Sequence, residues 1–440
     1  MSTSSQQGER STEAGTRRHV RRLTSATIGQ SAPAVKVWRA SLAAAAVASI
    51  GACSSSAPIR QASGLPYDSI ATEQLASGVV HRRLVANQGP FTINVVEVST
   101  HRRDLVITAV HALDSLRGRE LTSSMVARRT ATTAVIAAVN ADFFDLKTGE
   151  NENNQVVDGV VLKAVPITDS PFDSLHTVHT QFGMTCDGRP VIDRFVFSGA
   201  VLTPPPARAI LPLDAVNFRP RADAMVLYTP AYGVTPADSA GRLTVEAPLR
   251  AVAQAGDTLV FESAGAPHTG GGTAVHAGEA ILAGGGAVAE VVRRLAGSLA
   301  PTTQLRIVTS FVPKRGRLCT LVGGWPRLVV DGRSIADSAD RLEGTFPRFS
   351  TTRHPRTGIG FSRDSSTLYL ITVDGRSESS SGMSLAEFAA LMQALGVAQG
   401  LNLDGGGSTT LVIRGQVVNH PSDSTGERTV GNALLVTRRR

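Results

Sequence analysis

The chain has 440 residues, of which 42% are hydrophobic and 18% are charged. It is therefore long and apolar enough to bury a sizeable core, which excludes general disorder. No stretch reaches the roughly 18 to 20 apolar residues of a spanning helix, which excludes a polytopic membrane protein. The net charge of +8 is concentrated in residues 1–39, which hold seven Arg or Lys and two Glu. Because the rest of the chain is close to neutral, no nucleic-acid partner is predicted.

The first 52 residues have the layout of an export signal. A basic, Ser/Thr-rich segment is followed by the uncharged apolar run 40–52 and then by Cys53. Positive charge, then apolar residues, then small residues is the order found in secretory signals. We predict a lipoprotein-type export signal over 1–52, lipidation of Cys53, and a flexible tether over 53–74. The protein is then exported to the cell envelope and anchored in the membrane by lipid. The alternative is a short buried helix with an incidental cysteine.

Two further cysteines follow, Cys186 and Cys319. An exported protein meets an oxidising compartment, in which a disulfide is stable. A disulfide and two separate buried thiols remain alternatives, because sequence does not give the distance between the residues. Two cysteines alone do not form a Cys-rich zinc site.

From about residue 75 the pattern is one of short apolar strands with few helices. Ser384 and Glu387 form a capping box for one helix, which Gly396 ends. We predict strands over 91–98, 105–110, 133–139, 305–312, 368–373 and 410–413, and helices over 122–129, 287–299 and 384–395. The proline-rich residues 200–220 read as a surface excursion. The fold class is α+β: β-rich mixed sheets with a few packed helices, in one large catalytic-type domain over 75–440.

The most informative stretch for function is a glycine-rich loop after the last predicted helix. Asp404 enters it from a strand, Gly405, Gly406 and Gly407 follow, and Ser408 leaves it. Consecutive glycines allow close backbone approach to a ligand and expose N–H groups that suit an anion. The alternative is a glycine-rich hairpin turn that Asp404 caps.

Two charged positions flank the predicted strands nearby. Arg356 precedes a strand, where its guanidinium has the geometry to grip a phosphate through two parallel hydrogen bonds; the alternative is a surface arginine paired with a carboxylate. Asp374 ends the strand 368–373, followed closely by Arg376. A carboxylate at a strand end is a candidate functional group, and the alternative is an ordinary Asp-Gly turn.

A third set of polar residues follows the strand 133–139. Asn140 and Asp142 stand at the strand end, and the two phenylalanines that follow them are expected in the core.

Together these residues resemble the phosphodiester glycosidase family. The similarity runs over roughly residues 85–437. Its pieces, in chain order, are Asn140-x-x-Phe-Phe144, Gly323-Gly-Trp-Pro-Arg-Leu328, Pro355-Arg-Thr-Gly358, Val373-Asp-Gly-Arg376, Gly382-Met-Ser384, Leu403-Asp-Gly-Gly-Gly-Ser408 and Asn432-Ala-Leu-Leu435. The chain departs from the family at Ala141 and Asp142, where two glycines are usual, and at Trp325, where a small residue is common. Trp325 either stacks on a sugar face or fills the core beneath its loop.

The resemblance implies cleavage of the bond between a sugar's anomeric carbon and a phosphate oxygen. An oxocarbenium-like transition state calls for a carboxylate, and Asp404 and Asp374 are the candidates. Arg356 is expected to hold the phosphate. The substrate-binding candidates are Asn140, Asp142, Gly324, Trp325, Arg376, Gly405, Gly406, Gly407 and Ser408. No cofactor and no metal site are expected, although a divalent cation beside Asp404 stays open.

The predicted function is that of an exported hydrolase of a sugar-1-phosphodiester, of the N-acetylhexosamine-1-phosphate kind, on envelope or extracellular glycans. The alternative is a non-catalytic, surface-anchored polysaccharide-binding lipoprotein. A third reading is a metal-dependent phosphodiesterase that breaks the other P–O bond and releases a sugar phosphate.

Overall fold

A computed structural model describes residues 68–168, 175, 177–219, 222–237 and 244–439. All of them belong to one compact unit, residues 58–440. The predicted export signal, Cys53 and the first part of the predicted tether lie outside the described residues. The first described strand begins at Ser69, so residues 69–74, which the sequence assigns to the tether, are paired in a sheet.

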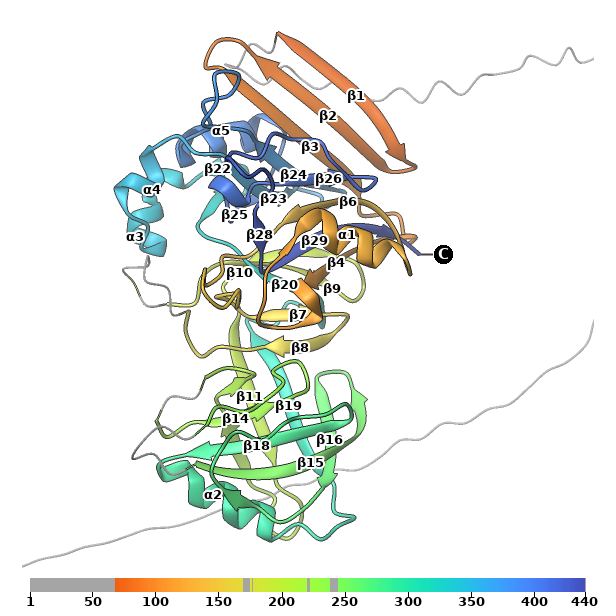
Figure 1. Ribbon diagram of the computed structural model, residues 1–440, viewed down its shortest axis with the longest axis vertical. Helices are drawn as coiled ribbons and strands as arrows, with labels where there is room; N and C mark the ends of the chain where they lie inside the picture. The colour runs from red at the N-terminus through yellow and green to blue at the C-terminus, as the bar shows by residue number, and fades with distance from the viewer. Residues whose placement is uncertain (1–67, 169–174, 176, 220–221, 238–243, 440) are drawn as a thin grey trace, which may run out of the picture. The chain divides into compact units, whose positions relative to one another are not determined.

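The strands form four large sheets and one small one (Figure 1). The eight-stranded sheet runs in the order β1 (Ser69–Ala76), β2 (Val79–Ala86), β3 (Phe91–Ser99), β24 (Thr367–Val373), β23 (Arg356–Phe361), β25 (Gln399–Leu403), β21 (Arg327–Val330) and β22 (Arg333–Ser334). Every pair in it is antiparallel. Antiparallel pairing brings the end of one strand next to the start of its neighbour.

Two further sheets have five strands each. The β6 sheet runs β27 (Gln416–Val417), β26 (Leu411–Ile413), β6 (Ala134–Asn140), β29 (Asn432–Arg438) and β4 (Leu105–His111). The β20 sheet runs β10 (Pro190–Asp193), β9 (Gln181–Thr185), β20 (Leu318–Gly323), β7 (Gln155–Val157) and β8 (Val160–Lys163). A two-stranded pair joins β28 (Thr429–Val430) to β5 (Glu120–Leu121).

The nine-stranded sheet is built from residues 196–312. Its order is β12 (Ile210–Leu213), β11 (Val196–Leu202), β19 (Leu305–Val312), β16 (Thr258–Ser263), β15 (Thr244–Ala255), β18 (Glu279–Gly285), β14 (Met225–Tyr228) and β13 (Ala215–Val216), with β17 (His268–Thr269) pairing β15. β13 and β14 form a parallel pair, so this sheet is mixed. The proline-rich residues 200–220, expected to be a surface excursion, contribute β12 and β13.

Five α-helices occur in the described residues: α1 (Thr122–Thr130), α2 (Ala287–Gly297), α3 (Ala339–Glu343), α4 (Pro347–Thr351) and α5 (Leu385–Ala394). The capping box of α5 is confirmed, because the Ser384 side chain accepts from the Glu387 amide and the Glu387 side chain accepts from the Ser384 amide. None of the described helices is long and apolar enough to cross a membrane. The α+β, β-rich fold class is confirmed.

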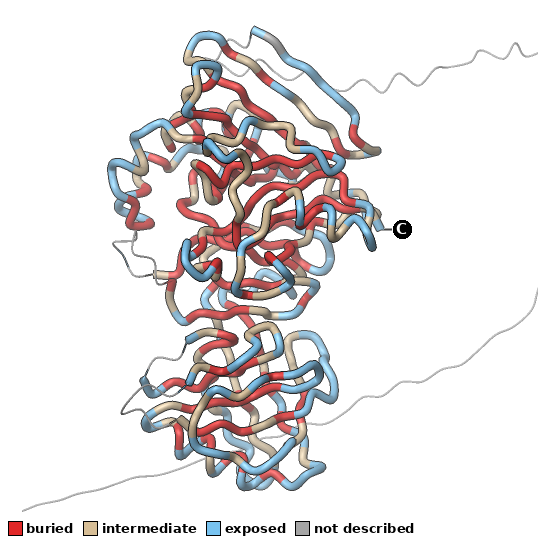
Figure 2. The backbone as a smooth tube through the Cα atoms, in the orientation of Figure 1, coloured by how far each residue is buried: buried red, intermediate tan, exposed pale blue. Residues whose placement is uncertain are grey.

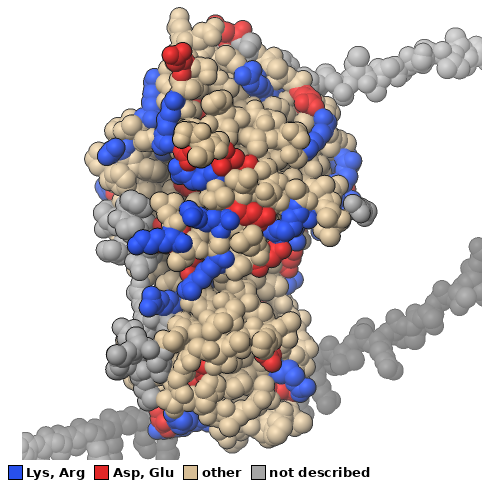
Figure 3. Space-filling model, viewed as in Figure 1, with Lys and Arg blue, Asp and Glu red and all other residues tan. Residues whose placement is uncertain are grey.

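The core follows the predicted apolar pattern (Figure 2). Phe388 and Met392 of α5 are buried, and they pack so closely on β23 that a side chain at Gly358 would collide with both. Ala289 and Val292 of α2 are buried in a second cluster with the nine-stranded sheet. In Figure 3 acidic and basic side chains are interspersed on the visible face, as expected for a chain body close to neutral.

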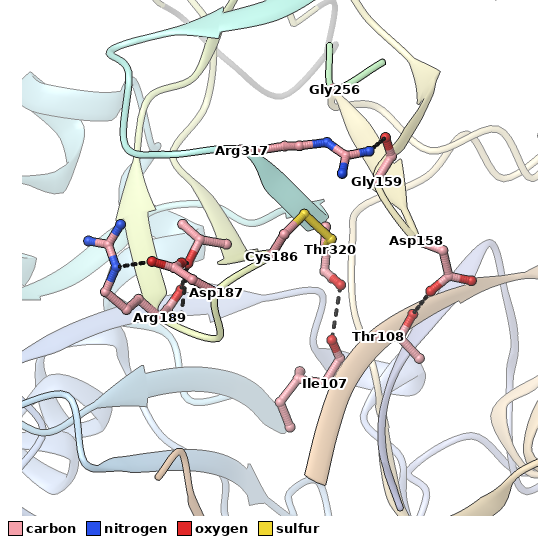
Figure 4. Close-up of a disulfide and its surroundings, with 12 residues drawn as sticks. Ile107, Thr108, Asp158, Gly159, Cys186, Asp187, Arg189, Gly256, Arg317 and Thr320 are labelled. Carbon is pink, nitrogen blue, oxygen red and sulfur yellow. Dashed lines mark hydrogen bonds and ion pairs between the residues drawn. A yellow bond between two sulfur atoms is a disulfide. The ribbon is translucent and has the colours of Figure 1, made fainter. Parts of the chain in front are cut away.

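A disulfide joins Cys186 and Cys319 (Figure 4). Of the two alternatives left by the sequence, the disulfide is therefore the one observed. Cys186 directly follows β9, and Cys319 lies in β20, so the disulfide links two neighbouring strands covalently. The next residue, Thr320, donates a hydrogen bond from its hydroxyl to the Ile107 carbonyl at 3.0 Å. The β20 sheet is thereby tied to β4.

Candidate active site

Three neighbouring strands of the eight-stranded sheet, β24, β23 and β25, each have one end at the same side of the sheet. Arg356, the first residue of β23, pairs with the last residue of β24, and the next residue pairs with the last residue of β25. Asp374 and Asp404 directly follow those two strands. The antiparallel register therefore brings Arg356, Asp374 and Asp404 to the same end of the sheet, as the sequence-based hypothesis requires.

Asn140 connects the β6 sheet to this edge. Its Nδ2 donates to the Asp404 carbonyl at 2.6 Å, and its Oδ1 accepts from the Thr357 hydroxyl at 2.8 Å and the Thr410 amide at 3.1 Å. The side chain is fully buried. In this structure the polar atoms of Asn140 position the loop that carries Asp404, and substrate binding by Asn140 stays a prediction.

Asp404 is a carboxyl group at this end of the sheet whose pKa is raised. Burial raises its pKa to about 6, and the negative charge of Asp142 adds to the rise. The Ser408 hydroxyl, the positive charge of Arg428 and the Gly405 amide oppose it. The backbone amide of Asp404 donates to the Ala141 carbonyl at 2.9 Å, which fixes the loop against the end of β6. A carboxyl group with a pKa near neutrality is suited to proton transfer at physiological pH.

Asp142 is the carboxylate that acts on Asp404, and its own side chain is buried. Its oxygens accept from Asn153 Nδ2 at 2.7 Å and from the Asn153 amide at 3.3 Å, and its amide donates to Asn432 Oδ1 at 2.9 Å. Burial raises the pKa of Asp142, and these hydrogen bonds oppose the rise. Asp142 was predicted to bind substrate, and that stays a prediction; in this structure its carboxylate is hydrogen-bonded to Asn153 and lies close enough to Asp404 to act on it.

Asp374 was predicted as the second catalytic carboxylate, and its Oδ1 and its carbonyl both have partners within the fold. Its Oδ1 accepts from Asn419 Nδ2 at 3.2 Å and from the His420 amide at 3.1 Å. Its carbonyl accepts from the Ser380 hydroxyl at 2.6 Å. Burial raises its pKa. Asp374 therefore holds together the two loops that follow β24 and β27.

The glycine-rich loop is not an open anion cradle. The Gly406 amide donates to the Pro355 carbonyl at 2.9 Å, and the Gly405 amide is directed to the Asp404 carboxyl group. The glycines are needed for close approach, because a Cβ at Gly405 would lie 2.7 Å from the Pro355 oxygen and one at Gly407 would lie 2.1 Å from Arg428 Nη2. In this structure the amides of Gly405 and Gly406 therefore already have partners within the chain, and anion binding by the loop stays a prediction.

Ser408 remains a candidate ligand group. Its side chain is buried, and its Oγ makes no hydrogen bond of standard geometry to any residue that the structure describes. Its hydroxyl is nonetheless close enough to Asp404 to lower that group's pKa. A buried hydroxyl without a partner is costly unless a ligand or water satisfies it.

Arg356, the predicted phosphate clamp, is committed to the backbone. Its Nε donates to the Met383 carbonyl at 2.8 Å, and its Nη2 donates to the Phe349 and Thr352 carbonyls at 2.9 and 3.2 Å. The guanidinium packs on the Phe349 ring at 5.1 Å, and the residue is only 1% exposed. Burial lowers its pKa to about 10. Arg356 therefore ties α4 to the residues that precede α5. Its Nε and Nη2 groups, which a bidentate contact with phosphate would use, donate to backbone carbonyls instead.

Arg376 is the guanidinium that is exposed at the glycine loop. Its backbone is left-handed, with φ of 60°. Its Nη2 lies 3.0 Å from where a Cβ on Gly406 would be, and its Nη1 donates weakly to the Ser422 hydroxyl at 3.4 Å. No ion pair of Arg376 is recorded with any described residue. This predicted substrate-binding residue is placed within reach of a ligand on the loop that Asp404 enters.

His354 is a titratable residue at this end of the sheet that was not among the predicted site residues. Burial lowers its pKa first, and the positive charges of Arg356 and Arg376 lower it further. An imidazole whose pKa is lowered by two guanidinium groups marks a locally positive environment, which favours an anionic ligand. The only sequence signal for it was its place directly before Pro355.

Trp325 and Gly324 serve packing. Trp325 is 3% exposed, its ring stacks on His179 and Phe349, and its Nε1 donates to the Glu343 carbonyl at 2.6 Å. The core alternative for Trp325 is therefore the right one, and the sugar platform is wrong. At Gly324 a Cβ would lie 2.7 Å from the Asn402 oxygen, so this glycine is needed for contact with β25.

Clusters of three or more His, Cys, Asp or Glu side chains that could hold a metal ion do not occur among the residues that the structure describes.

Comparisons with known proteins identify the relatives of this chain. Residues 251–437 match the family model described as phosphodiester glycosidase. The mouse protein N-acetylglucosamine-1-phosphodiester alpha-N-acetylglucosaminidase is 30% identical over 127 residues, which are 29% of this chain and 24% of that protein. A Bacillus subtilis protein, SPbeta prophage-derived uncharacterized protein YomE, is 40% identical over 85 residues, which are 19% of this chain and 13% of that protein. The chain therefore spans less than a quarter of the length of these relatives.

A solved structure shows the same fold. The crystal structure of a hypothetical protein from Synechocystis aligns with 84% of this chain and 64% of its own, with a TM-score of 0.63 and 20% identity.

Proposed function

The chain is related to the phosphodiester glycosidase family through residues 251–437, and from this relationship we propose that it hydrolyses the bond between a sugar's anomeric carbon and a phosphate oxygen. The name of the mouse relative suggests an N-acetylhexosamine-1-phosphodiester as substrate. One observation in the structure carries the proposal. A carboxyl group with a pKa near 6, Asp404, and an exposed guanidinium, Arg376, lie at the same five-residue loop.

In this proposal Asp404 is the general base. A water molecule attacks the anomeric carbon, its proton passes to Asp404, and the electron pair of the breaking C–O bond stays on the phosphate. The leaving group is a phosphate monoester, whose second pKa is near 6, so it needs less protonation than an alcohol would. If Asp404 acts as a base towards water, the configuration at the anomeric carbon is inverted. If the configuration is retained, Asp404 acts as the nucleophile instead.

The positive groups at this edge would hold the phosphate. Arg376 is exposed and lies over Gly406, and Arg428 acts electrostatically on Asp404 while paired with Asp423 at 2.7 Å. His354 lies in the field of Arg356 and Arg376. Charge-assisted hydrogen bonds to phosphate are about twice as strong as neutral ones. Arg356 takes part in this proposal only through its charge, since its Nε edge is bound to the backbone.

The decisive experiment is hydrolysis of N-acetylglucosamine-1-phosphate methyl ester by the full chain in water labelled with oxygen-18. Cleavage of the C–O bond puts the label in the free sugar and supports the proposal. Label in the phosphate of methyl phosphate or of a sugar phosphate means cleavage of a P–O bond, and the proposal fails. Saturable binding of the ester without any turnover would favour the non-catalytic polysaccharide-binding lipoprotein.

We also propose that the protein is exported and lipid-anchored at Cys53, and that its substrates are envelope glycans. The disulfide between Cys186 and Cys319 supports an oxidising compartment. Metabolic labelling with an alkyne fatty acid tests the anchor. Labelled protein in the membrane fraction is expected for the wild type, and loss of the label in Cys53→Ser. Equal labelling of both would rule the anchor out at this residue.

A further inference from the structure

A hollow of about 470 Å³ lies at the end of the β6 sheet that is remote from the candidate active site. We call it the arginine hollow. The lining residues that matter here are Thr108, Arg129, Thr133, Asp158, Arg438 and Arg439. Its volume is within the range of ligand pockets, roughly 300 to 1,000 Å³.

Its charge is positive. Arg129 and Arg439 have no recorded ion pair with any residue in the described part of the chain, and the amide of Arg439 donates to the Asp104 carbonyl at 2.8 Å, which fixes the backbone there. Arg438 is paired with Asp104 at 3.4 Å, but Asp104 is also bound by Arg102 at 2.9 Å. Against three guanidinium groups the hollow has one lining carboxylate, Asp158. Unpaired guanidinium groups around a concave surface favour phosphate or carboxylate ligands.

The hollow and the candidate active site lie at opposite ends of the same strands. β6 begins at Ala134, next to the hollow, and ends at Asn140, which holds the Asp404 loop. β29 runs the other way, from Asn432 beside Asp142 to Arg438 in the hollow. Six residues of strand separate the ends by about 20 Å. The two sites are therefore distinct and are held at a fixed spacing by the sheet.

The disulfide supports one wall of the hollow (Figure 4). Asp158 lies in the turn between β7 and β8, where it accepts from the Thr108 hydroxyl at 3.2 Å. The next amide, that of Gly159, donates to the Cys319 carbonyl at 3.0 Å. Arg317, an exposed residue two positions before Cys319, reaches the same turn with Nη2 3.5 Å from the Gly159 carbonyl. The wall is thus rigid, and Arg317 adds another positive charge near it.

We propose that the arginine hollow is a second binding site, which holds phosphate groups of an anionic glycan polymer while another unit of the polymer lies at Asp404. The choice of a phosphate-bearing glycan rests on the proposed function, whereas the presence of an anion site rests on the hollow alone. Two sites joined by a rigid sheet raise the effective concentration of the polymer at each.

The test measures binding of a phosphate-bearing mannan to the full chain by affinity electrophoresis, with neutral mannan as the uncharged control. Arg129→Gln/Arg439→Gln removes two charges from the hollow. Arg293→Gln/Arg294→Gln, on α2, removes two charges elsewhere and is the matched control. Thr133→Asp adds a negative charge to the hollow without removing a side chain that pairs. Thermal unfolding of each variant checks that it is folded.

The expected result is binding of phosphomannan that weakens at least about tenfold in Arg129→Gln/Arg439→Gln and in Thr133→Asp, with no change in the α2 variant. Undiminished affinity in both hollow variants overturns the proposal, and so does an equal loss in the α2 variant, which would mean attraction by net charge. Capture of phosphatidylglycerol vesicles without binding of phosphomannan overturns it in favour of a lipid surface.

The hollow can be tested whether or not the enzyme activity is confirmed. Hydrolysis of the small methyl ester should be unchanged in Arg129→Gln/Arg439→Gln, because these residues lie at the far end of the sheet. If the wild type hydrolyses no ester, the proposed function fails, but the phosphomannan result still decides on the hollow.

Discussion

The nine-stranded sheet and the region that carries the candidate active site use the chain in different ways. The sheet takes one continuous run of chain, from β11 to β19, and its pair β11–β19 joins the two ends of that run. The site joins the end of β6 to the loop after β25 through the hydrogen bond between Asn140 and Asp404, which are 264 residues apart. Figure 3 also shows few charged side chains on the face over β11, β14, β15 and β18.

This difference explains where function can reside. A sheet made from one run of chain forms without strands from outside that run. Pairing between distant segments costs more loop-closure entropy before the contacts that offset it can form. None of the predicted site residues lies in the nine-stranded sheet. The region with costly long-range contacts is the one that places a carboxyl group and a guanidinium at one loop. Four sets of variants test this difference between the two regions.

The largest effect is expected for Asp404→Asn. Loss of the proton acceptor should lower kcat/KM for the sugar phosphodiester by about 10³-fold or more, measured by sugar release. The fold should survive. The pKa of Asp404 is raised in the folded state, so its ionisation opposes folding above pH 6, and that cost disappears as the pH falls through 6 towards 4.

Urea unfolding checks the same variant. At pH 7 Asp404→Asn should be more stable than the wild type by on the order of 2 kcal/mol, and at pH 4 the gain should vanish. Full activity of the variant would remove Asp404 from the mechanism, and a large loss of stability would show that the carboxylate is structural.

The next largest effect is expected for Arg376→Gln. Without the exposed guanidinium, KM for the phosphodiester should rise roughly 10- to 100-fold, while an aryl N-acetylglucosaminide, which has no phosphate, should be hydrolysed as before. Arg376→Lys keeps the charge and should lose less. Steady-state kinetics on both substrates decide the matter, and equal losses on the two would contradict a phosphate contact.

A matched pair of buried asparagines compares the two regions directly. Asn140 makes three hydrogen bonds at the site, and Asn217 makes three with Leu162 and Thr229 beside the nine-stranded sheet. Either change to Ala should cost about 2 to 4 kcal/mol in urea unfolding. Activity per folded molecule should fall about tenfold in Asn140→Ala only. An equal fall in Asn217→Ala would mean that the two regions are coupled.

The smallest effect is expected for Asp142→Asn. The charge of Asp142 raises the pKa of Asp404, so its removal should lower that pKa. The acid limb of kcat/KM, near pH 6 in the wild type, should move to lower pH. An acid limb that stays in place would show that Asp142 does not act on the group that titrates.

Local signals in the sequence predict the elements well. The strand over 305–312 agrees with β19 at both ends, and the capping box at Ser384 places the start of α5. Both depend on residues within a few positions of one another. The strand β1 was missed because its exposed residues carry little apolar pattern, and pairing with β2 holds it in the sheet.

The roles of the site residues are predicted less well. Asp404 and Arg376 lie where the sequence suggests, but the side chains of Arg356 and Trp325 are buried and contact other parts of the fold. Nothing near Arg356 in the sequence indicates that three carbonyls of α4 and the α5 entry accept its hydrogen bonds. The surroundings of Asp374 and Asp142 were missed for the same reason, since the partners of each lie on other loops.

Apolar spacing and short motifs are local properties of the chain, and they were enough to predict the β-rich fold class, a resemblance to phosphodiester glycosidases and a carboxylate at the end of β25. Only the tertiary structure decided which carboxylate acts on Asp404, which guanidinium is exposed to a ligand, and that Cys186 and Cys319 join. Burial, neighbouring charge and distance fix these outcomes, and all three arise when distant strands pair.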